Sequence, residues 1–487
     1  MTRSILFLFA AGLLVLALLE ILWSPAEAQS LAVIGYIFGA FTLLLILTTE
    51  ELTFYNPITY LLVNLFVGIF ARSLIIAYID DPRIDVLFTR GKEAIEFTEV
   101  VVWLFPMLVL FIGGYATATG RFKRIEESPE STMDIPMKWT KPGYILFQIV
   151  FLGIAALGTF SYINKMGIAD SLLSLEGLST KRHLMIEGRS AALGYERWAS
   201  SLTSVVYYAS LILYLGFERK EYGVSRGKLA FYFFLAVFFP FVTSSRSTVL
   251  FTIINSVIIY SIFRKIQLRH LLVYVGSVLF FFQIMTELRK MRLDRESKRE
   301  VEGLYGIVAP FLENRNLFDL SKTAHIFNSV PEKMPYMYGS SFMNILYAPI
   351  PRTMWKEKPD IQIGLVVASD IYDIPRAHQT AIPPGLMGEM YMNFGVLGII
   401  FGVFLYGYSM RWAWSLAKRP NFKQKPMVVL LYVMILLPGT FYLLGASIQQ
   451  ASIRMLQFFF AAYAAHYLMK FNFGIPNRKV IKLRKED

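Results

Sequence analysis

The sequence contains no cysteine, only five histidines and few charged residues. Without cysteine, the chain has no disulfide, no thiolate ligand for a metal and no cysteine nucleophile. Charged residues make up 17% of the chain, whereas soluble domains carry roughly a quarter. The five histidines form no metal-binding cluster, and the sequence has no phosphate-binding glycine loop of the P-loop type. These absences exclude an ordinary soluble fold and argue against the common soluble enzymes.

What the sequence does contain is long apolar segments. Of the 487 residues, 55% are hydrophobic, and the mean hydropathy is +0.49. A helix that spans a membrane needs about 20 mostly apolar residues. By this measure the sequence predicts about twelve spans, at 5–23, 31–49, 57–79, 99–118, 144–163, 200–217, 229–243, 247–263, 271–286, 394–414, 427–445 and 452–469. The first could also be a signal peptide, but its apolar stretch is long for one, which favours a membrane helix.

The net charge of +13 is distributed unevenly. Lysine and arginine gather in alternate short loops and in the tail after residue 469. Cytoplasmic loops collect these residues, so the pattern predicts that both termini of this multi-pass membrane protein are cytoplasmic. A basic surface would also suit an anionic substrate.

Two long segments then fall on the outer side, at about 164–199 and at 287–393. The second is too long for a connector, and its hydrophobic content argues against disorder. We therefore expect an all-α polytopic membrane protein with a large, partly helical periplasmic loop. The predicted divisions are 1–286 for helices one to nine, 287–393 for the large loop, 394–469 for the last three helices and 470–487 for a basic tail.

Three arginines lie at the predicted outer boundary: Arg72, Arg246 and Arg454. A charged side chain near hydrocarbon usually faces a cavity or a partner, and the guanidinium fork matches phosphate oxygens. Together they could hold a lipid-linked pyrophosphate. The alternative interpretation is that each reaches lipid headgroups or pairs with a buried carboxylate. Other basic candidates for substrate binding are Lys181 and Arg182 in the smaller loop and Arg289 and Arg292 in the large one.

The large loop carries an ordered series of motifs. These are Tyr-Gly-Ser-Ser from Tyr338, Ile-Pro-Arg-x-x-Trp-x-x-Lys-Pro from Ile350, a His-x-Thr element at His378, and Gly-x-x-Gly-Glu-x-Tyr-x-Asn-Phe-Gly from Gly385. In this order, and with the Ser-Ser-Arg turn that ends at Arg246, they resemble the Wzy-type O-antigen polymerases, which join oligosaccharide repeat units. The resemblance covers mainly 243–247 and 336–395; the rest matches in hydropathy and topology.

The resemblance implies a GT-C-like membrane glycosyltransferase that needs no cofactor and no metal. The growing glycan, carried on undecaprenyl pyrophosphate, would be transferred to a new lipid-linked repeat unit. Arginines stabilise the charge that develops on the pyrophosphate, and a base accepts the proton of the attacking hydroxyl. The implied catalytic residues are Arg246, Arg352, His378 and Glu389. The implied binding residues include Tyr338, Trp355, Lys358 and Tyr391, the three aromatic ones stacking on sugars. Glu389 is expected to face solvent or the cavity.

The implied partners are lipid-linked oligosaccharides as donor and acceptor, the bilayer, and a protein that regulates chain length, with no role for nucleic acid. Three other interpretations remain open from the sequence. The first is an O-antigen ligase-like enzyme, which uses the same donor with another acceptor. The second is a transporter of lipid-linked oligosaccharide, although repeated halves typical of transporters are not evident. The third is a scaffold for polysaccharide export.

Overall fold

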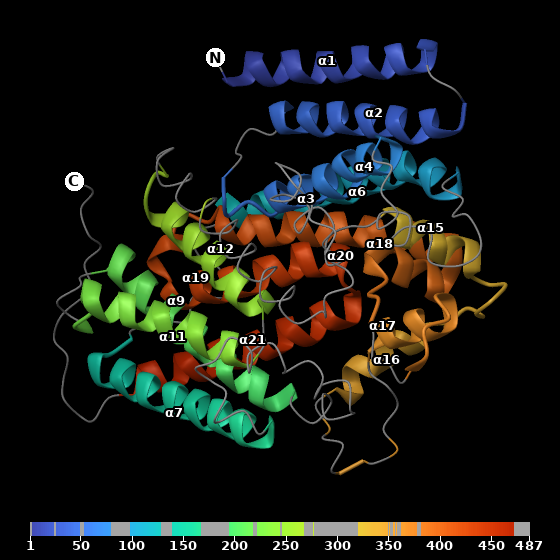
Figure 1. The fold of residues 1–487 in the computed structure, drawn as a ribbon. Helices are drawn as coiled ribbons and strands as arrows, with labels where there is room; N and C mark the ends of the chain where they lie inside the picture. Colours follow the sequence, from blue (N-terminus) through green and yellow to red (C-terminus); the bar gives the residue numbers. More distant parts are fainter. Residues whose placement is uncertain are drawn as a thin grey trace. The chain divides into compact units, whose positions relative to one another are not determined.

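The computed structural model describes residues 2–23, 26–48, 53–78, 98–127, 139–166, 194–217, 222–243, 246–266, 320–348, 362–376 and 381–471, with single positions at 276, 350, 354, 355 and 357. In these residues all regular structure is helical, and no strand occurs (Figure 1).

The helices follow the predicted spans wherever the described residues reach. The single ones are α1 (Thr2–Trp23), α2 (Ala26–Thr48), α6 (Thr98–Glu127), α7 (Lys141–Met166), α9 (Gly194–Gly216), α11 (Arg226–Val242), α12 (Arg246–Phe263), α18 (Gly385–Ala417) and α21 (Ile448–Lys470). Two are composite: α3 (Pro57–Leu65), η1 (Phe66–Ala71) and α4 (Arg72–Tyr78) form one, and α19 (Pro426–Leu437), η7 (Pro438–Tyr442) and α20 (Leu443–Gly445) form the other. The predicted span at 271–286 lies outside the described residues, apart from Gly276.

Six of the described helical segments are long and apolar enough to cross a membrane. They are Pro57–Leu74, Val102–Phe122, Lys141–Lys165, Tyr195–Gly216, Gly385–Ala417 and Pro426–Gly445. Shorter apolar helices occur at Phe7–Ile21, Ala32–Leu45 and Thr248–Phe263. By length and composition the chain is therefore a helical membrane protein.

Several helices begin where a polar side chain can satisfy free backbone amides. The side chain of Asn56 accepts a hydrogen bond from the amide of Ile58 at 3.1 Å, and Pro57 is the first residue of α3. Ser225 accepts from the amide of Lys228 in the same way at the start of α11. These are ordinary N-caps, and they fix the helix starts that hydropathy alone leaves uncertain.

Two boundaries differ from those predicted by six residues or more. Helix α9 begins at Gly194 rather than at 200, so Glu196 lies on a helix, where its carboxylate pairs with Lys165. Helix α6 ends at Glu127 rather than at 118. In both cases polar residues lowered the local hydropathy, although the helix continues through them. The long apolar part of α18 begins where predicted, at 394, after a short helix at residues 385–393 that was not predicted.

The chain divides into two compact units. Unit 1 contains Met1–Arg124, Leu312–Ser415 and Leu437–Met455, and unit 2 contains Ile125–Phe311, Leu416–Leu436 and Leu456–Asp487. Unit 1 therefore groups the described part of the large loop with the first helices of the chain. This division cuts the chain differently from the predicted boundaries at 286 and 393.

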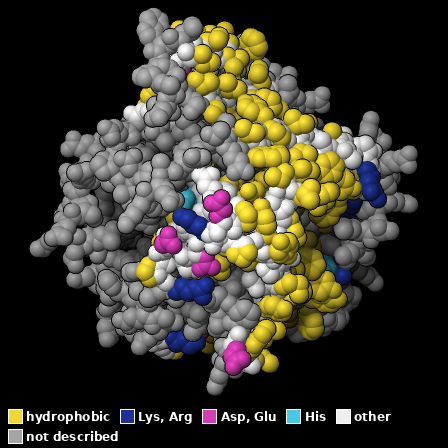
Figure 2. Space-filling model, turned by 90° about the vertical axis from the view of Figure 1, so that its right-hand side faces the viewer, with side chains coloured by type: hydrophobic (Ala, Val, Ile, Leu, Met, Phe, Trp, Pro, Cys, Tyr) yellow, Lys and Arg dark blue, Asp and Glu magenta, His cyan; other side chains and the backbone are white. Residues whose placement is uncertain are grey.

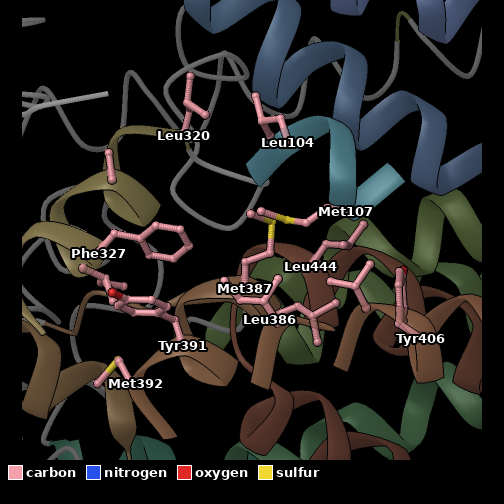
Figure 3. Close-up of a cluster of buried hydrophobic side chains, with 14 of the residues drawn as sticks. Leu104, Met107, Leu320, Phe327, Leu386, Met387, Tyr391, Met392, Tyr406 and Leu444 are labelled. Atoms are coloured by element: carbon pink, nitrogen blue, oxygen red, sulfur yellow. The ribbon is translucent and has the colours of Figure 1, made fainter. Parts of the chain in front are cut away.

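The core of unit 1 joins helices that are far apart in the sequence. Leu104 and Met107 on α6 belong to the same buried cluster as Phe327 on α15 (Leu320–Ser329) and Met387 on α18 (Figure 3). Leu444, near the end of α20, completes this part of the cluster. Burial of such side chains stabilises a fold by about 1.5–3 kcal/mol each, so the loop helix α15 is an integral part of unit 1.

Unit 2 is held together by hydroxyl groups as well as by apolar contacts. Helix α9 bonds to its neighbours through Ser200 and Thr243 at 2.8 Å and through Ser204 and Thr252 at 2.9 Å. Tyr144 on α7 bonds to Ser210 at 2.6 Å. Because lipid offers no hydrogen-bond partners, such pairs join apolar helices that lack a hydrophobic driving force to associate.

Candidate functional site

Helix α18 consists of two parts, separated by Phe394 and Gly395, whose backbone angles are not helical. Gly395 has φ +59° and ψ −143°, a region that essentially only glycine adopts. The first part, residues 385–393, coincides with the Gly-Glu-Tyr-Asn motif of the sequence. It starts at Gly385, which also has a positive φ of +73°. The motif therefore forms a short helix of its own, placed immediately before the long apolar one.

Glu389 is fully buried on this short helix. Its Oε1 accepts a hydrogen bond from the Ser341 hydroxyl at 3.1 Å, and its Oε2 accepts from the backbone amide of Ile448 at 2.7 Å. Ile448 is the first residue of α21, where free amides and the helix dipole favour a negative charge. Within the described residues, no lysine or arginine pairs with Glu389. Because Glu389 is fully buried, the expectation that its side chain faces solvent or a cavity is not met.

Asn393 ends the short helix and is also fully buried. Its Nδ2 donates to the Ser341 hydroxyl at 2.9 Å and to the carbonyl of Glu389 at 2.7 Å. Its Oδ1 accepts from the amide of Gly339 at 2.9 Å. The Tyr-Gly-Ser-Ser motif and the Gly-Glu-Tyr-Asn motif thus meet in one hydrogen-bonded cluster, which we call the Glu389 cluster: Gly339, Ser341, Glu389, Asn393 and Ile448.

Three more contacts hold the turn between α20 and α21, residues 446–447, and the helix ends beside it. Lys322 on α15 donates through Nζ to the carbonyl of Gly445 at 3.0 Å, and the amide of Gly385 donates to the carbonyl of Ala446 at 2.8 Å. The amide of Ile363, which begins α17 (Ile363–Val366), donates to Oε1 of Gln449 at 3.2 Å. A side chain at 385 would lie 2.6 Å from the carbonyl oxygen of Leu444, so the motif glycine permits this approach.

The three aromatic residues predicted to stack on sugars lie in different surroundings. Tyr391 is buried and stacks on Phe327, with ring centroids 4.2 Å apart, so it is part of the core (Figure 3). Trp355 is half-buried against Tyr347. Tyr338 is 78% exposed, and its backbone has φ +47°, which is rare for a bulky residue. Of the three, Tyr338 presents the most surface to a ligand.

Two of the predicted arginines belong to unit 1. Arg72 follows the π-helix η1 directly and is only 1% exposed, near the end of an apolar helix. π-helical turns are frequent at functional sites, and a buried guanidinium in an apolar span is costly without a purpose. Arg454 lies on the second turn of α21, and its Cζ is 4.8 Å from the centre of the Tyr442 ring. This cation–π contact holds the guanidinium close to the α20–α21 turn.

The remaining predicted site residues are less defined. Arg246 is the first residue of α12, in unit 2, and only its backbone is described. Seven others lie outside the described residues: Lys181, Arg182, Arg289, Arg292, Arg352, Lys358 and His378. Their roles stay predictions: those of Arg352, Lys358 and His378 come from the family resemblance, and those of the other four come from their charge and their place in the predicted loops. Among the described residues, no group of three or more acidic, histidine or cysteine side chains could hold a metal ion.

Sequence reasoning missed three residues that organise this region: Asn393, Lys322 and Gln449. Asn393 is part of the Gly-Glu-Tyr-Asn motif, but its role depends on hydrogen-bond partners that are 52 and 54 residues away in the sequence. Lys322 and Gln449 lie in segments without a motif. A buried lysine on a helix with an otherwise apolar face could have been a signal for Lys322.

Comparisons with known proteins add one match. A family described only as a domain of unknown function, DUF8712, matches residues 310–422. This range runs from before α15 to beyond the end of α18 and contains the Tyr-Gly-Ser-Ser and Gly-Glu-Tyr-Asn motifs. No curated protein and no solved structure matches the chain.

Proposed function

We propose that the protein polymerises lipid-linked oligosaccharide repeat units in a bacterial inner membrane. The growing glycan on undecaprenyl pyrophosphate is transferred to the non-reducing end of a new lipid-linked repeat unit, at the periplasmic face, and undecaprenyl pyrophosphate is released. The helices hold the lipid tails, and the loop between residues 287 and 393 covers the sugars.

One observation carries this proposal. Arg72, Arg454 and the exposed Tyr338 belong to the same compact unit as the segment with the polymerase-like motifs. The unit thus combines guanidinium groups on apolar helices with an aromatic ring on a polar loop. A substrate with an isoprenoid tail, a pyrophosphate and a glycan needs these three kinds of surface.

The transfer step needs a leaving-group site and a base. The acceptor hydroxyl oxygen attacks the anomeric carbon of the donor, and the bond from that carbon to the pyrophosphate oxygen breaks. The pyrophosphate leaves with the electron pair, and fixed arginines stabilise its charge. We assign this role to Arg72 and Arg454 of unit 1, with Arg352 as a further candidate from the family resemblance. The proton passes to a base, which we assign to His378; Glu389 is the alternative, although both of its oxygens already accept hydrogen bonds.

The test uses full-length protein reconstituted in vesicles with lipid-linked repeat units extracted from the producing cells. We expect a ladder of longer lipid-linked glycans and one undecaprenyl pyrophosphate for each new linkage. Arg454→Gln should slow this release at least ten-fold relative to the wild type. The rate for Arg454→Lys should lie between those of the wild type and Arg454→Gln. Transfer of glycan only to a different acceptor would replace the proposal with a ligase. Movement of intact substrate across the bilayer without new linkages would replace it with a transporter.

A second prediction concerns the aromatic residues. Tyr338→Ala should weaken binding of the glycan and raise the KM for the acceptor several-fold, because stacking on an exposed ring contributes about 1 kcal/mol or more. The thermal midpoint of unfolding should not change, since the side chain is exposed. Tyr391→Ala is the matched control, and we expect it to lower the thermal midpoint because it leaves a cavity beside Phe327. An unchanged KM for Tyr338→Ala would remove this residue from the site.

A further inference from the structure

Helix α16 (Ser340–Tyr347) has two different faces. Ser341 points inward, where it bonds to Glu389 and Asn393. Met343 and Leu346, three residues apart and therefore on one face, are exposed, Leu346 by 66%. Met354, further along the loop, is exposed as well. Helix α16 is thus held to the protein by hydrogen bonds of Ser341 on one face, and it exposes large apolar side chains on its other face.

The position of α16 is fixed at the break in α18. Phe342 contacts Phe394, with ring centroids 6.2 Å apart. The amides of Met337 and Tyr338, just before α16, donate to the carbonyls of Met392 and Asn393 at 2.8 and 3.1 Å. Helix α16 is therefore attached at the point where the long apolar part of α18 begins.

From this point an exposed apolar stripe continues along α18. It consists of Leu397, Phe401 and Leu405, which are spaced by four residues and share one face, with the exposed Phe394 of the break just before them. This helix is a candidate membrane span, so the stripe is suited to contact lipid. On one side of the molecule, Figure 2 shows hydrophobic side chains in a broad tract, with a cluster of acidic and basic side chains beside it.

We propose that α16 is an interfacial helix, which lies at the bilayer surface with Met343 and Leu346 among the lipid acyl chains. The argument is continuity: the exposed face of α16 joins the lipid-facing stripe of α18 through Phe342 and Phe394. Helices of this kind bury one apolar face by about 5–10 Å at the headgroup boundary. The exposed face of α16 accordingly binds a lipid surface. This contact holds the Tyr338–Ser341 segment at a defined depth in the membrane. This inference does not depend on the proposed glycosyl transfer.

The absence of cysteine from the chain makes a direct test possible, because each single-cysteine variant carries one nitroxide label. The full-length variant Leu346→Cys is labelled and reconstituted in vesicles of phosphatidylcholine and phosphatidylglycerol. Its accessibility to oxygen and to a water-soluble nickel chelate is then measured. Phe401→Cys serves as the lipid-exposed control and Glu332→Cys, exposed on the loop before α16, as the aqueous control.

We expect the ratio of oxygen to nickel accessibility at 346 to lie well above that at 332 and to approach that at 401. Met343→Cys should give the same result. A nickel accessibility at 346 equal to that at 332 would overturn the proposal, because the face would then be in water. Low accessibility to both reagents would also overturn it, since a protein partner or a second copy of the chain would then cover the face.

Discussion

Replacement of Gly114 by alanine is expected to lower the stability of unit 1 more than any other single methyl group added to helix α6. A Cβ atom at position 114 would lie 2.0 Å from the carbonyl oxygen of Phe404 and 3.1 Å from the amide of Tyr408, both on α18. Contacts under 3.0 Å with backbone cannot be relieved by a side-chain rotation, so the two helices must move apart. Overpacking of this kind costs about 1–3 kcal/mol and occasionally more.

A glycine on α18 makes a similarly close approach to α6. A Cβ at Gly407 on α18 would lie 2.2 Å from the carbonyl oxygen of Phe111 on α6. Two glycines therefore let α6 and α18 cross with their backbones in contact, as small residues do between membrane helices. Gly407→Ala should have an effect similar to that of Gly114→Ala, and the double variant should cost less than the sum, because either methyl group alone already separates the helices.

The matched control is Gly120→Ala on the same helix. No atom lies within 4 Å of a Cβ at that position, and alanine forms helix better than glycine by about 1 kcal/mol. The thermal midpoint of detergent-purified protein should therefore fall for Gly114→Ala and stay the same or rise for Gly120→Ala. Equal midpoints for the two variants would show that the α6–α18 crossing is not a tight one.

The second large effect is expected at Glu389. Glu389→Ala removes the acceptor for the buried Ser341 hydroxyl and for the partly buried amide of Ile448. Each buried donor without a partner costs about 1–3 kcal/mol, and the lost side chain also leaves a cavity. The variant should unfold at a much lower temperature than the wild type, because the turn between α20 and α21 loses one of its attachments.

Glu389→Gln distinguishes an anchoring role from a chemical one. The amide oxygen can accept from Ile448, and the amide nitrogen can donate to Ser341, so the fold should be retained. Because donors already occupy both oxygens of Glu389, we expect this variant to keep most of the glycan transfer. A folded Glu389→Gln protein with no transfer would contradict this expectation and would assign the catalytic base to Glu389.

The helices could be predicted from the sequence better than the contacts between them. Hydropathy located α7, α12 and α19 to within a few residues, because a long apolar run has few alternatives to a membrane helix. It did not predict the short helix at residues 385–393, since Glu389 and Asn393 look like loop residues. Their burial depends on Ser341 and Ile448, which are 48 and 59 residues from Glu389. No local pattern contains such partners.

The candidate site shows the same limit. In the structure two of the motifs meet, because Ser341 of the first bonds to Glu389 and Asn393 of the last. They could not tell which side chains point inward. Tyr391 was expected to contact sugar, yet an aromatic residue two positions after a buried glutamate on a short helix packs against Phe327. A motif indicates that residues share a site, but exposure follows from tertiary packing alone.

The composition of unit 1 has a consequence for biosynthesis. Its first stretch of chain is far from its last, because about 300 residues lie between Arg124 and Leu437. At a synthesis rate of about 5–20 residues per second, the first helices wait roughly 15–60 s for the turn that carries Ile448. For most of this interval the backbone at Gly114 lacks its contacts with Phe404 and Tyr408, which follow it by about 290 residues. A nascent protein of this design depends on the insertion machinery or on lipid to keep its first helices apart from other chains.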